Sequence, residues 1–107
     1  MKDNVIIAEF MGLPKEKVGL KQEVIYGLNQ DDWYTSDNLN YHISWDWLMP
    51  VVEKIDEISN ENILFKIEHN RAFIEDIENY HIFIDVISNS RIEATYKAVV
   101  EFIKDRG

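Results

Sequence analysis

The sequence of 107 residues contains no cysteine and few residues that interrupt regular structure, with four glycines and two prolines. The absence of cysteine excludes disulfide bonds, thiolate zinc sites and cysteine nucleophiles, and it is typical of proteins from a reducing compartment. We therefore expect a cytoplasmic location. The glycines stand too far apart to form a Walker loop or a G-x-G-x-x-G motif, so no motif indicates nucleotide binding.

The chain also lacks long apolar runs and is poor in positive charge. The segment from Met1 to Met11 carries Asp3 and Glu9, so we expect neither a signal peptide nor a membrane span. Eleven lysines and arginines stand against 20 aspartates and glutamates, which gives a formal net charge of −9. Binding to nucleic-acid phosphates requires clustered cations, so direct contact with nucleic acid is disfavoured. The charge favours a partner with a basic surface, although solubility alone would explain it equally well.

What the sequence does contain is enough apolar material for one core. Apolar residues make up 46% of the chain and aromatic residues 12%. A chain of this length is close to the commonest size of one domain. The sequence therefore predicts a single domain over residues 1–107.

The N-terminal part of the chain gives short elements. Apolar side chains at helical spacing predict a first helix, with Asp3 or Asn4 as its N-cap and Gly12 as its stop. Polar residues with a glycine predict a loop after it, and two apolar runs predict short strands. The predicted elements are a helix over Asp3–Met11, a loop over Pro14–Lys21, and strands over Gln22–Leu28 and Asp32–Thr35 joined by a turn at Asn29–Asp31.

The next segment has a clear amphipathic pattern. An apolar stripe opposite an acidic one predicts a helix over Ser44–Ser59, with Ser44 as the N-cap. Inside a regular helix the ring of Pro50 would clash with the carbonyl group of Asp46. We therefore expect an irregular stretch over Trp45–Met49 and a regular helix from near Pro50.

In the C-terminal half, Asn62–Glu68 alternates between apolar and polar residues, which predicts a strand, and turn residues at 69–70 and 78–79 delimit two further strands. Ser90 and Glu93 then form an S-x-x-E capping box that opens a last helix. Three strands, over Asn62–Glu68, Arg71–Ile77 and Tyr80–Ile87, are expected to form an antiparallel meander before the helix that runs to Lys104. The fold class is thus α+β, with the order α-(β-β)-α-β-β-β-α and helices packed on a small antiparallel sheet of three to five strands.

No set of residues indicates catalysis. None of the five serines lies in a G-x-S-x-G motif. His42 and Asp46 stand four apart, and His81 and Asp85 are expected to share one strand face, but a metal site needs three or four converging ligands. Neither spacing matches H-E-x-x-H or an EF-hand loop. We predict no enzymatic activity, no catalytic residues, no metal and no cofactor.

An acidic aromatic segment is the most unusual local feature. All three tryptophans fall between residues 33 and 47, among tyrosines and aspartates. Large rings within an acidic rim suit the binding of a basic protein surface, because aromatic anchors supply binding energy and charge steers the encounter. Alternatively, the rings fill the core, as we expect for Trp47. The predicted partner-binding residues are Asp31, Asp32, Trp33, Tyr34, Asp37, Trp45 and Asp46.

A second acidic group could imitate the phosphates of a nucleic acid. Such mimicry requires a dense surface of one sign, and Lys54 and Lys66 interrupt it here. A solvated face is therefore the favoured interpretation. The group comprises Glu53, Asp56, Glu57, Glu61, Glu75, Asp76 and Glu78.

Three blocks of the sequence carry a resemblance to a known group of proteins. These are AEFMG at Ala8–Gly12, YHISWDWLMPVVEKI at Tyr41–Ile55 and IEATYKAVVEFIK at Ile92–Lys104. In this order they resemble small uncharacterised proteins of phages and prophages of Bacteroidota, and the layout is similar to the phage α/β/α sandwich domain. The resemblance implies a phage origin, and hence the cytoplasm of an infected bacterium, but it implies no reaction.

Three functional hypotheses follow. The first is a phage-encoded, non-enzymatic inhibitor of a host defence protein, similar to anti-CRISPR proteins. An RNA-guided nuclease, with a basic channel, would be a fitting target for an acidic inhibitor. The second is a phage housekeeping or assembly protein that self-associates into a homo-oligomer. The third is a metal-dependent enzyme built on His42, His81 and Asp85.

Overall fold

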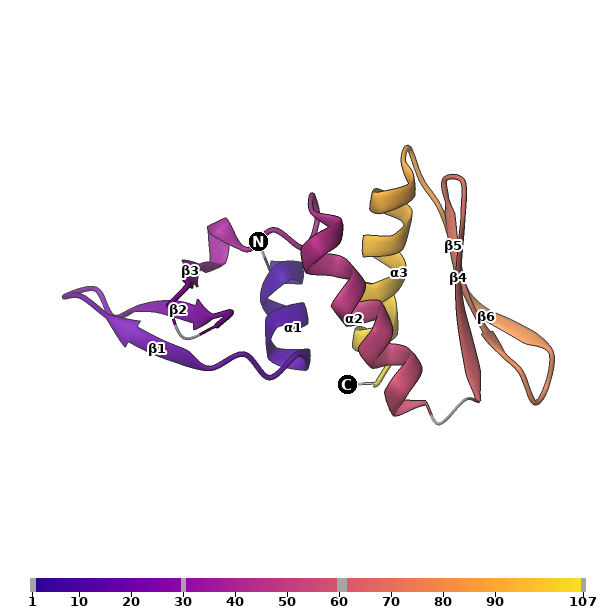
Figure 1. Ribbon diagram of the computed structural model, residues 1–107, viewed down its shortest axis with the longest axis horizontal. Helices are drawn as coiled ribbons and strands as arrows, with labels where there is room; N and C mark the ends of the chain where they lie inside the picture. The colour runs from indigo at the N-terminus through magenta and orange to yellow at the C-terminus, as the bar shows by residue number, and fades with distance from the viewer. Residues whose placement is uncertain (1, 30, 60–61, 107) are drawn as a thin grey trace. The chain divides into compact units, whose positions relative to one another are not determined.

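The computed structural model describes residues 2–29, 31–59 and 62–106. The predicted α+β class and the predicted order of elements are confirmed (Figure 1), and the strands form two three-stranded antiparallel sheets. The chain divides into two compact units, Met1–Asn40 and Tyr41–Gly107, and each is described by itself. The elements are α1 (Lys2–Phe10), β1 (Lys15–Val18), β2 (Glu23–Gly27), β3 (Trp33–Thr35), the 3-10 turn η1 (Ser36–Asn38), α2 (Trp45–Ile58), β4 (Ile63–Glu68), β5 (Arg71–Asp76), β6 (His81–Ile87) and α3 (Arg91–Arg106).

Helix α1 opens the first unit and ends where the sequence predicts. Gly12 follows it with φ +70°, a left-handed conformation that glycine adopts without strain. The predicted N-cap is wrong, because the helix already begins at Lys2. Asn4 is instead buried, and its side-chain amide donates a hydrogen bond of 2.9 Å to the carbonyl oxygen of Leu39. This bond ties α1 to the segment after η1.

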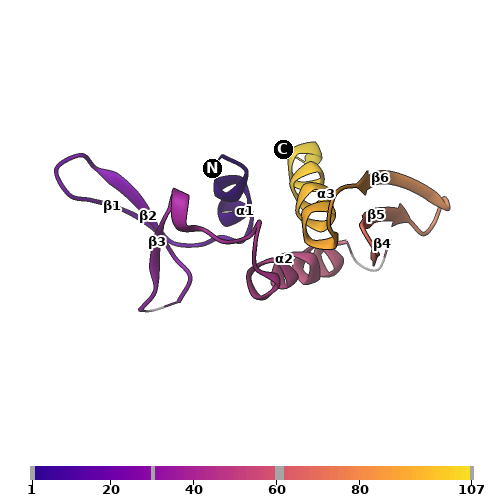
Figure 2. The same cartoon turned by 90° about the horizontal axis from the view of Figure 1, so that it is seen from above.

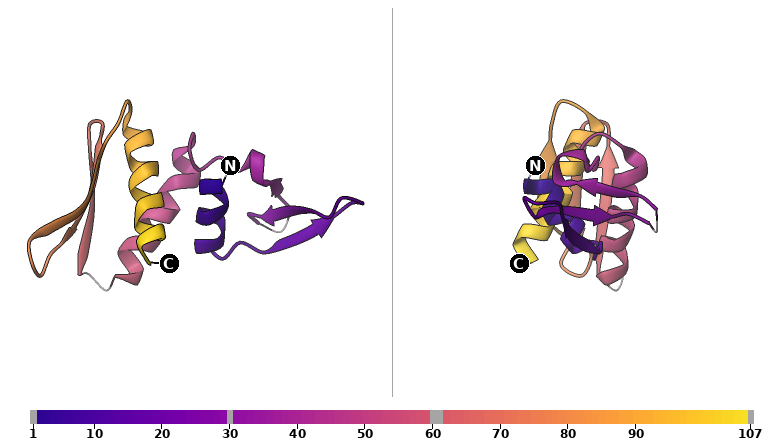
Figure 3. Two further views of the ribbon diagram at one scale, coloured as in Figure 1. Left: turned by 180° about the vertical axis from the view of Figure 1, so that it is seen from behind. Right: turned by 90° about the vertical axis from the view of Figure 1, so that its left-hand side faces the viewer.

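The sheet of the first unit has the order β1-β2-β3. Strands β2 and β3 confirm the two short predicted strands, whereas the predicted loop over Pro14–Lys21 is wrong, since β1 pairs with β2. All four residues of β1 are exposed, so no apolar alternation marked the strand. The β1–β2 hairpin, visible in both views of Figure 3, turns at Gly19 and Gln22, which both have positive φ.

The turn between β2 and β3 is partly described. Gln30, in the middle of the predicted turn at Asn29–Asp31, lies outside the described residues. The backbone N–H of Leu28 donates to the carbonyl oxygen of Asp32 at 2.9 Å, which closes the connection.

Helix α2 opens the second unit and is regular from its first turn. Ser44 occupies the predicted N-cap position, but its side chain makes no capping hydrogen bond. The predicted irregular stretch over Trp45–Met49 is wrong, because the helix begins at Trp45 and contains Pro50. Proline lacks an N–H, so the helix loses the bond to the carbonyl group of Asp46, four residues earlier. The rest of the helix buries Leu48, Val51, Val52 and Ile55.

The sheet of the second unit is the predicted meander, with the order β4-β5-β6. Figure 2 shows α2 and α3 on the same side of this sheet. Phe65, Ile74 and Ile84 pair across the three strands and are all buried, so they form the central row of the core. Among the described residues of the second unit, no helix packs on the opposite face (Figure 2). We call it the outer face; by strand register it contains Leu64, Lys66, Phe73, Glu75, Ile82 and Asp85.

Helix α3 confirms the predicted start of the last helix. The hydroxyl oxygen of Ser90 accepts a hydrogen bond of 3.2 Å from the backbone N–H of Glu93, as in a capping box. The Glu93 side chain forms an ion pair of 3.2 Å with Lys97 one turn later. None of the helices in the described ranges is long and apolar enough to cross a membrane.

Candidate partner-binding surface

The seven predicted binding residues fall into both units. Trp45 and Asp46 belong to the second unit, at the start of α2. Each group is described below within its own unit. The five in the first unit are Asp31, Asp32, Trp33, Tyr34 and Asp37.

Trp33 is the first residue of β3, and its indole ring packs over the neighbouring strand β2. It pairs with Gly27 of β2. A Cβ atom at position 27 would stand 3.1 Å from the indole ring, closer than most real contacts, so the ring rests where a side chain would otherwise project. Trp33 is nevertheless 37% exposed. The sheet therefore presents a partly exposed indole on a fixed support.

A hydrogen-bonded turn holds two aspartates directly before this tryptophan. The side-chain oxygen of Asn29 accepts bonds of 3.1 Å from the backbone N–H groups of Asp31 and Asp32. The Asn29 amide donates in turn to the Asp32 carboxylate at 2.8 Å. Side chains of asparagine commonly order turns in this way. We call Asp31 and Asp32 the acidic turn.

The strand register separates the charges of this sheet by face. Residues that pair directly across strands share a face, and successive residues alternate. One face, here called the Trp33 face, contains Glu16, Val18, Glu23, Ile25 and Trp33. The other, the lysine face, contains Lys15, Lys17, Val24, Tyr26 and Tyr34. The Lys-Glu-Lys-Val alternation of β1 matches this separation of charge, although the sequence predicts a loop there.

The remaining predicted residues of the first unit lie elsewhere. Tyr34 is half-buried and points to the lysine face, away from the face of Trp33. Asp37 is exposed in η1. Trp33 and the acidic turn are thus the part of the predicted surface that the first unit brings together.

In the second unit, the aromatic segment has both exposed and buried members. Trp45 is 36% exposed and Asp46 is exposed beside it. Tyr41 is only 2% exposed and meets Trp47 edge to face, with ring centroids 5.2 Å apart. Burial raises the pKa of Tyr41 to about 12, because ionisation would place a charge in an apolar site. Tyr41 and the half-buried Trp47 therefore pack internally, and Trp45 stays available for contact.

The residues considered for a metal site do not converge. The register of β5 and β6 shifts between Ile74 and Glu75, which inserts Phe83 as an extra residue. This bulge places His81 and Asp85 on opposite faces, so their predicted common face is wrong. In the described ranges no three histidine, cysteine or carboxylate residues are grouped so that they could hold a metal ion.

Asp85 instead takes part in an ion pair on the outer face. The guanidinium of Arg71 donates to both oxygens of its carboxylate at 2.8 Å and lies 4.3 Å from the ring centroid of Phe73. These hydrogen bonds hold the pKa of Asp85 below its ordinary value. His42, the third residue considered for a metal site, instead lies beside Tyr96, with ring centroids 6.0 Å apart.

The second acidic group is distributed over different structures. Glu53, Asp56 and Glu57 are exposed on α2, and Glu61 lies outside the described residues. The Asp76 carboxylate accepts hydrogen bonds from the backbone of Glu78 and from the Asn79 amide, and these lower its pKa. Asp76 therefore orders the turn that follows β5.

The sequence analysis missed a set of exposed apolar side chains in the second unit. Alternation indicated that one side of each strand turns away from the core, but it did not show that these positions on β4 and β6 are largely aliphatic. A run such as HIFIDVI fits a strand with either face inward, so the pattern leaves the outward residues open. The exposed residues are Leu64, Ile82, Phe83 and Ile87.

The chain matches no protein-family model, no curated protein and no solved structure. Inferences about function therefore rest on the side chains of the Trp33 face with its acidic turn and of the outer face.

Proposed function

We propose that this chain is a phage-encoded, non-enzymatic inhibitor that binds a host defence protein through the Trp33 face and the acidic turn. The partner has a basic surface, as an RNA-guided nuclease has along its nucleic-acid channel. The proposal rests on one observation: a partly exposed tryptophan, supported by Gly27, stands beside the two aspartates of the acidic turn.

The Trp33 face combines an aromatic anchor with negative charge. Tryptophan is among the residues most enriched at binding hot spots, and a ring fixed in advance loses little entropy on binding. The Trp33 face adds Glu16 and Glu23, and no lysine or arginine pairs into that face. Negative charge around the ring would steer a basic partner and select against acidic ones. Trp45 and Asp46 offer a second acidic aromatic contact in the other unit.

The test is the capture of a partner from a host lysate, with its identity established by mass spectrometry, followed by affinity measurements on purified components. Trp33→Ala should weaken binding by about tenfold or more, as expected for a hot-spot ring. Phe83→Ala is the matched control, because Phe83 is a similarly exposed ring on the other sheet. Raising the salt concentration should weaken the complex. Equal effects of the two substitutions, or affinity independent of salt, would refute the proposal.

A second candidate function is self-association through the outer face, as in a phage assembly protein. The observation that favours it is the exposure of the apolar residues Leu64, Ile82 and Ile87, which lie on this face among charged residues. Exposed apolar side chains within a polar rim commonly mark an interface. Sedimentation should then show a homo-oligomer that Ile82→Lys dissociates. A monomer at all accessible concentrations would exclude this candidate.

A further inference from the structure

A small pocket opens on the lysine face of the first sheet. It has a volume of about 270 Å³ and is lined by Lys15, Glu16, Lys17, Val24 and Tyr26. We propose that this pocket binds the phosphoryl group of a small phosphate monoester. The site lies on the opposite side of the sheet from Trp33, so it is independent of the protein-binding surface.

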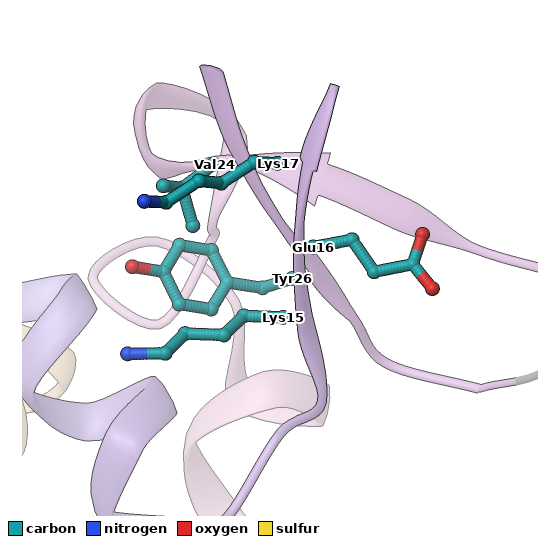
Figure 4. Close-up of a pocket in the computed structure, with 5 residues that line it drawn as sticks. All are labelled: Lys15, Glu16, Lys17, Val24 and Tyr26. Atoms are coloured by element: carbon teal, nitrogen blue, oxygen red, sulfur yellow. The ribbon is translucent and has the colours of Figure 1, made fainter. Parts of the chain in front are cut away.

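Three hydrogen-bond donors lie on the same side of the sheet there. Lys15 pairs with Tyr26 and Lys17 with Val24, which places both lysines and the tyrosine on one face. Figure 4 shows the two ammonium groups and the phenol hydroxyl pointing to the same side, while Glu16 points to the other. Tyr26 as a whole is only 5% exposed, and its hydroxyl lies at the end of the ring beside the two ammonium groups. An incoming anion could accept a hydrogen bond from this hydroxyl.

The spacing of the lysines suits a compact oxyanion. Two residues apart on a strand corresponds to about 6.7 Å along the chain. Figure 4 shows the Tyr26 ring between the two lysine side chains, so a phosphate would bind at their ends, where it could accept one charge-assisted hydrogen bond of about 2.8 Å from each ammonium group. Lysine recognises phosphate in this way as a point charge, without the fork geometry of arginine.

The surrounding charges favour a single phosphoryl group over a polyanion. A chain with a net charge of −9 repels an extended nucleic-acid backbone, whereas two lysines on one face can hold one dianion. Lys15 already has one anionic neighbour, since its Nζ atom lies 3.8 Å from an oxygen of Glu9. Both side chains of that pair are more than half exposed, so the pair is weak and a doubly charged ligand can displace it.

The pocket wall indicates an ester rather than free phosphate. Val24 and the ring of Tyr26 supply apolar surface directly beside the donors. A small apolar group attached to the phosphoryl oxygen would cover this surface and gain from its burial. We therefore expect phenyl phosphate to bind more tightly than inorganic phosphate.

The experiment is a titration of the full chain with phenyl phosphate and, separately, with inorganic phosphate. Binding is monitored through the NMR chemical shifts of the backbone amides. Saturable shifts should be confined to β1 and β2. Lys17→Gln should weaken binding by about tenfold, the loss of one charge-assisted hydrogen bond. Tyr26→Phe, which keeps the ring, should weaken it by a smaller factor. Lys66→Gln, at an exposed lysine of the second sheet, should leave the affinity unchanged.

Several outcomes would overturn the site. Shifts that sodium chloride reproduces at equal ionic strength would show general screening rather than binding. Unchanged affinity in both Lys17→Gln and Tyr26→Phe would exclude the pocket. Equal affinities for phenyl phosphate and inorganic phosphate would contradict the assignment to a monoester. None of these results bears on partner capture by the Trp33 face, so the two proposals can fail separately.

Discussion

The two sheets use strand alternation for different purposes. The strands of the second sheet have six, six and seven residues, and one face packs under α2 and α3. The strands of the first have four, five and three residues, and every residue of β1 is exposed. In the second sheet alternation separates a core from an outer face, whereas in the first it separates lysines from glutamates. The comparison shows that the second sheet contributes the buried core of its unit, whereas the first sheet carries most of its charge on exposed positions.

The largest expected effect comes from the centre of the second sheet. Ile74 is fully buried between Phe65 and Ile84. Ile74→Ala should lower the free energy of unfolding by about 2–5 kcal/mol, because it removes buried methyl groups and leaves a cavity. The neighbouring control, Ile82→Ala, changes a residue that is 38% exposed and should cost much less. Chemical denaturation of both variants is the measurement, and equal losses would contradict a one-sided core.

The next effect concerns how the first unit holds α1. Asn4→Ala removes the amide that donates to the Leu39 carbonyl group and leaves a buried acceptor unsatisfied. The expected loss of unfolding free energy is about 1–3 kcal/mol. Asn38→Ala provides the control, since Asn38 donates to the hydroxyl of Thr35 at an exposed position. If both variants are equally stable, the Asn4 bond does not anchor the helix.

The same comparison explains what could be predicted from the sequence. Strand β4 and helix α3 were predicted because their apolar residues recur with the period of a strand and of a helix. Strands β5 and β6 were predicted from short apolar runs between turn residues, although three successive residues of β5 are buried. Strand β1 escaped prediction because lysine and glutamate alternate without any apolar face. Strand β1 pairs with β2 through backbone hydrogen bonds, and these do not require any particular order of apolar and polar side chains. The irregular start expected for α2 is wrong because Pro50 lies near the helix N-terminus. There the helix loses only the hydrogen bond that the N–H of another residue would donate.

The candidate site was predictable only in part. Composition located the aromatic segment, but it does not show that Tyr41 is buried beside Trp47 or that Trp33 stays partly exposed over Gly27. The bulge at Phe83, which separates His81 from Asp85, has no signature in a run of apolar residues. The pocket on the lysine face could not be predicted from single residues, because only the register of β1 on β2 places Lys15, Lys17 and Tyr26 on one face.

A smaller effect distinguishes two helix starts in the second unit. Ser90 caps α3 by accepting from the N–H of Glu93, whereas Ser44 at the start of α2 makes no such bond. Ser90→Ala should therefore cost about 1 kcal/mol of stability. Ser44→Ala should cost less, and it serves as the matched control. Thermal denaturation of the two variants measures the difference, and the reverse order would show that the capping bond contributes nothing.

The smallest effect is electrostatic and depends on pH. Because Arg71 lowers the pKa of Asp85 in the folded state, the pair stabilises the fold above the ordinary aspartate pKa of about 3.9, and this contribution is lost as the pH falls below it. Asp85→Asn should lower the Tm slightly at neutral pH, since exposed pairs are weak. The difference from the unchanged protein should disappear in acid.

Arg71 also contacts the ring of Phe73, so Arg71→Ala removes both the ion pair and this ring contact, whereas Asp85→Asn removes only the charge of the pair. A double-mutant cycle of Arg71→Ala and Asp85→Asn separates the two. A coupling that is present at neutral pH and absent in acid would locate the pH dependence in the pair on the outer face. A coupling that is the same at both pH values would show that the pair adds packing rather than charge. The outer face would then be stabilised in the same way as the core beneath it.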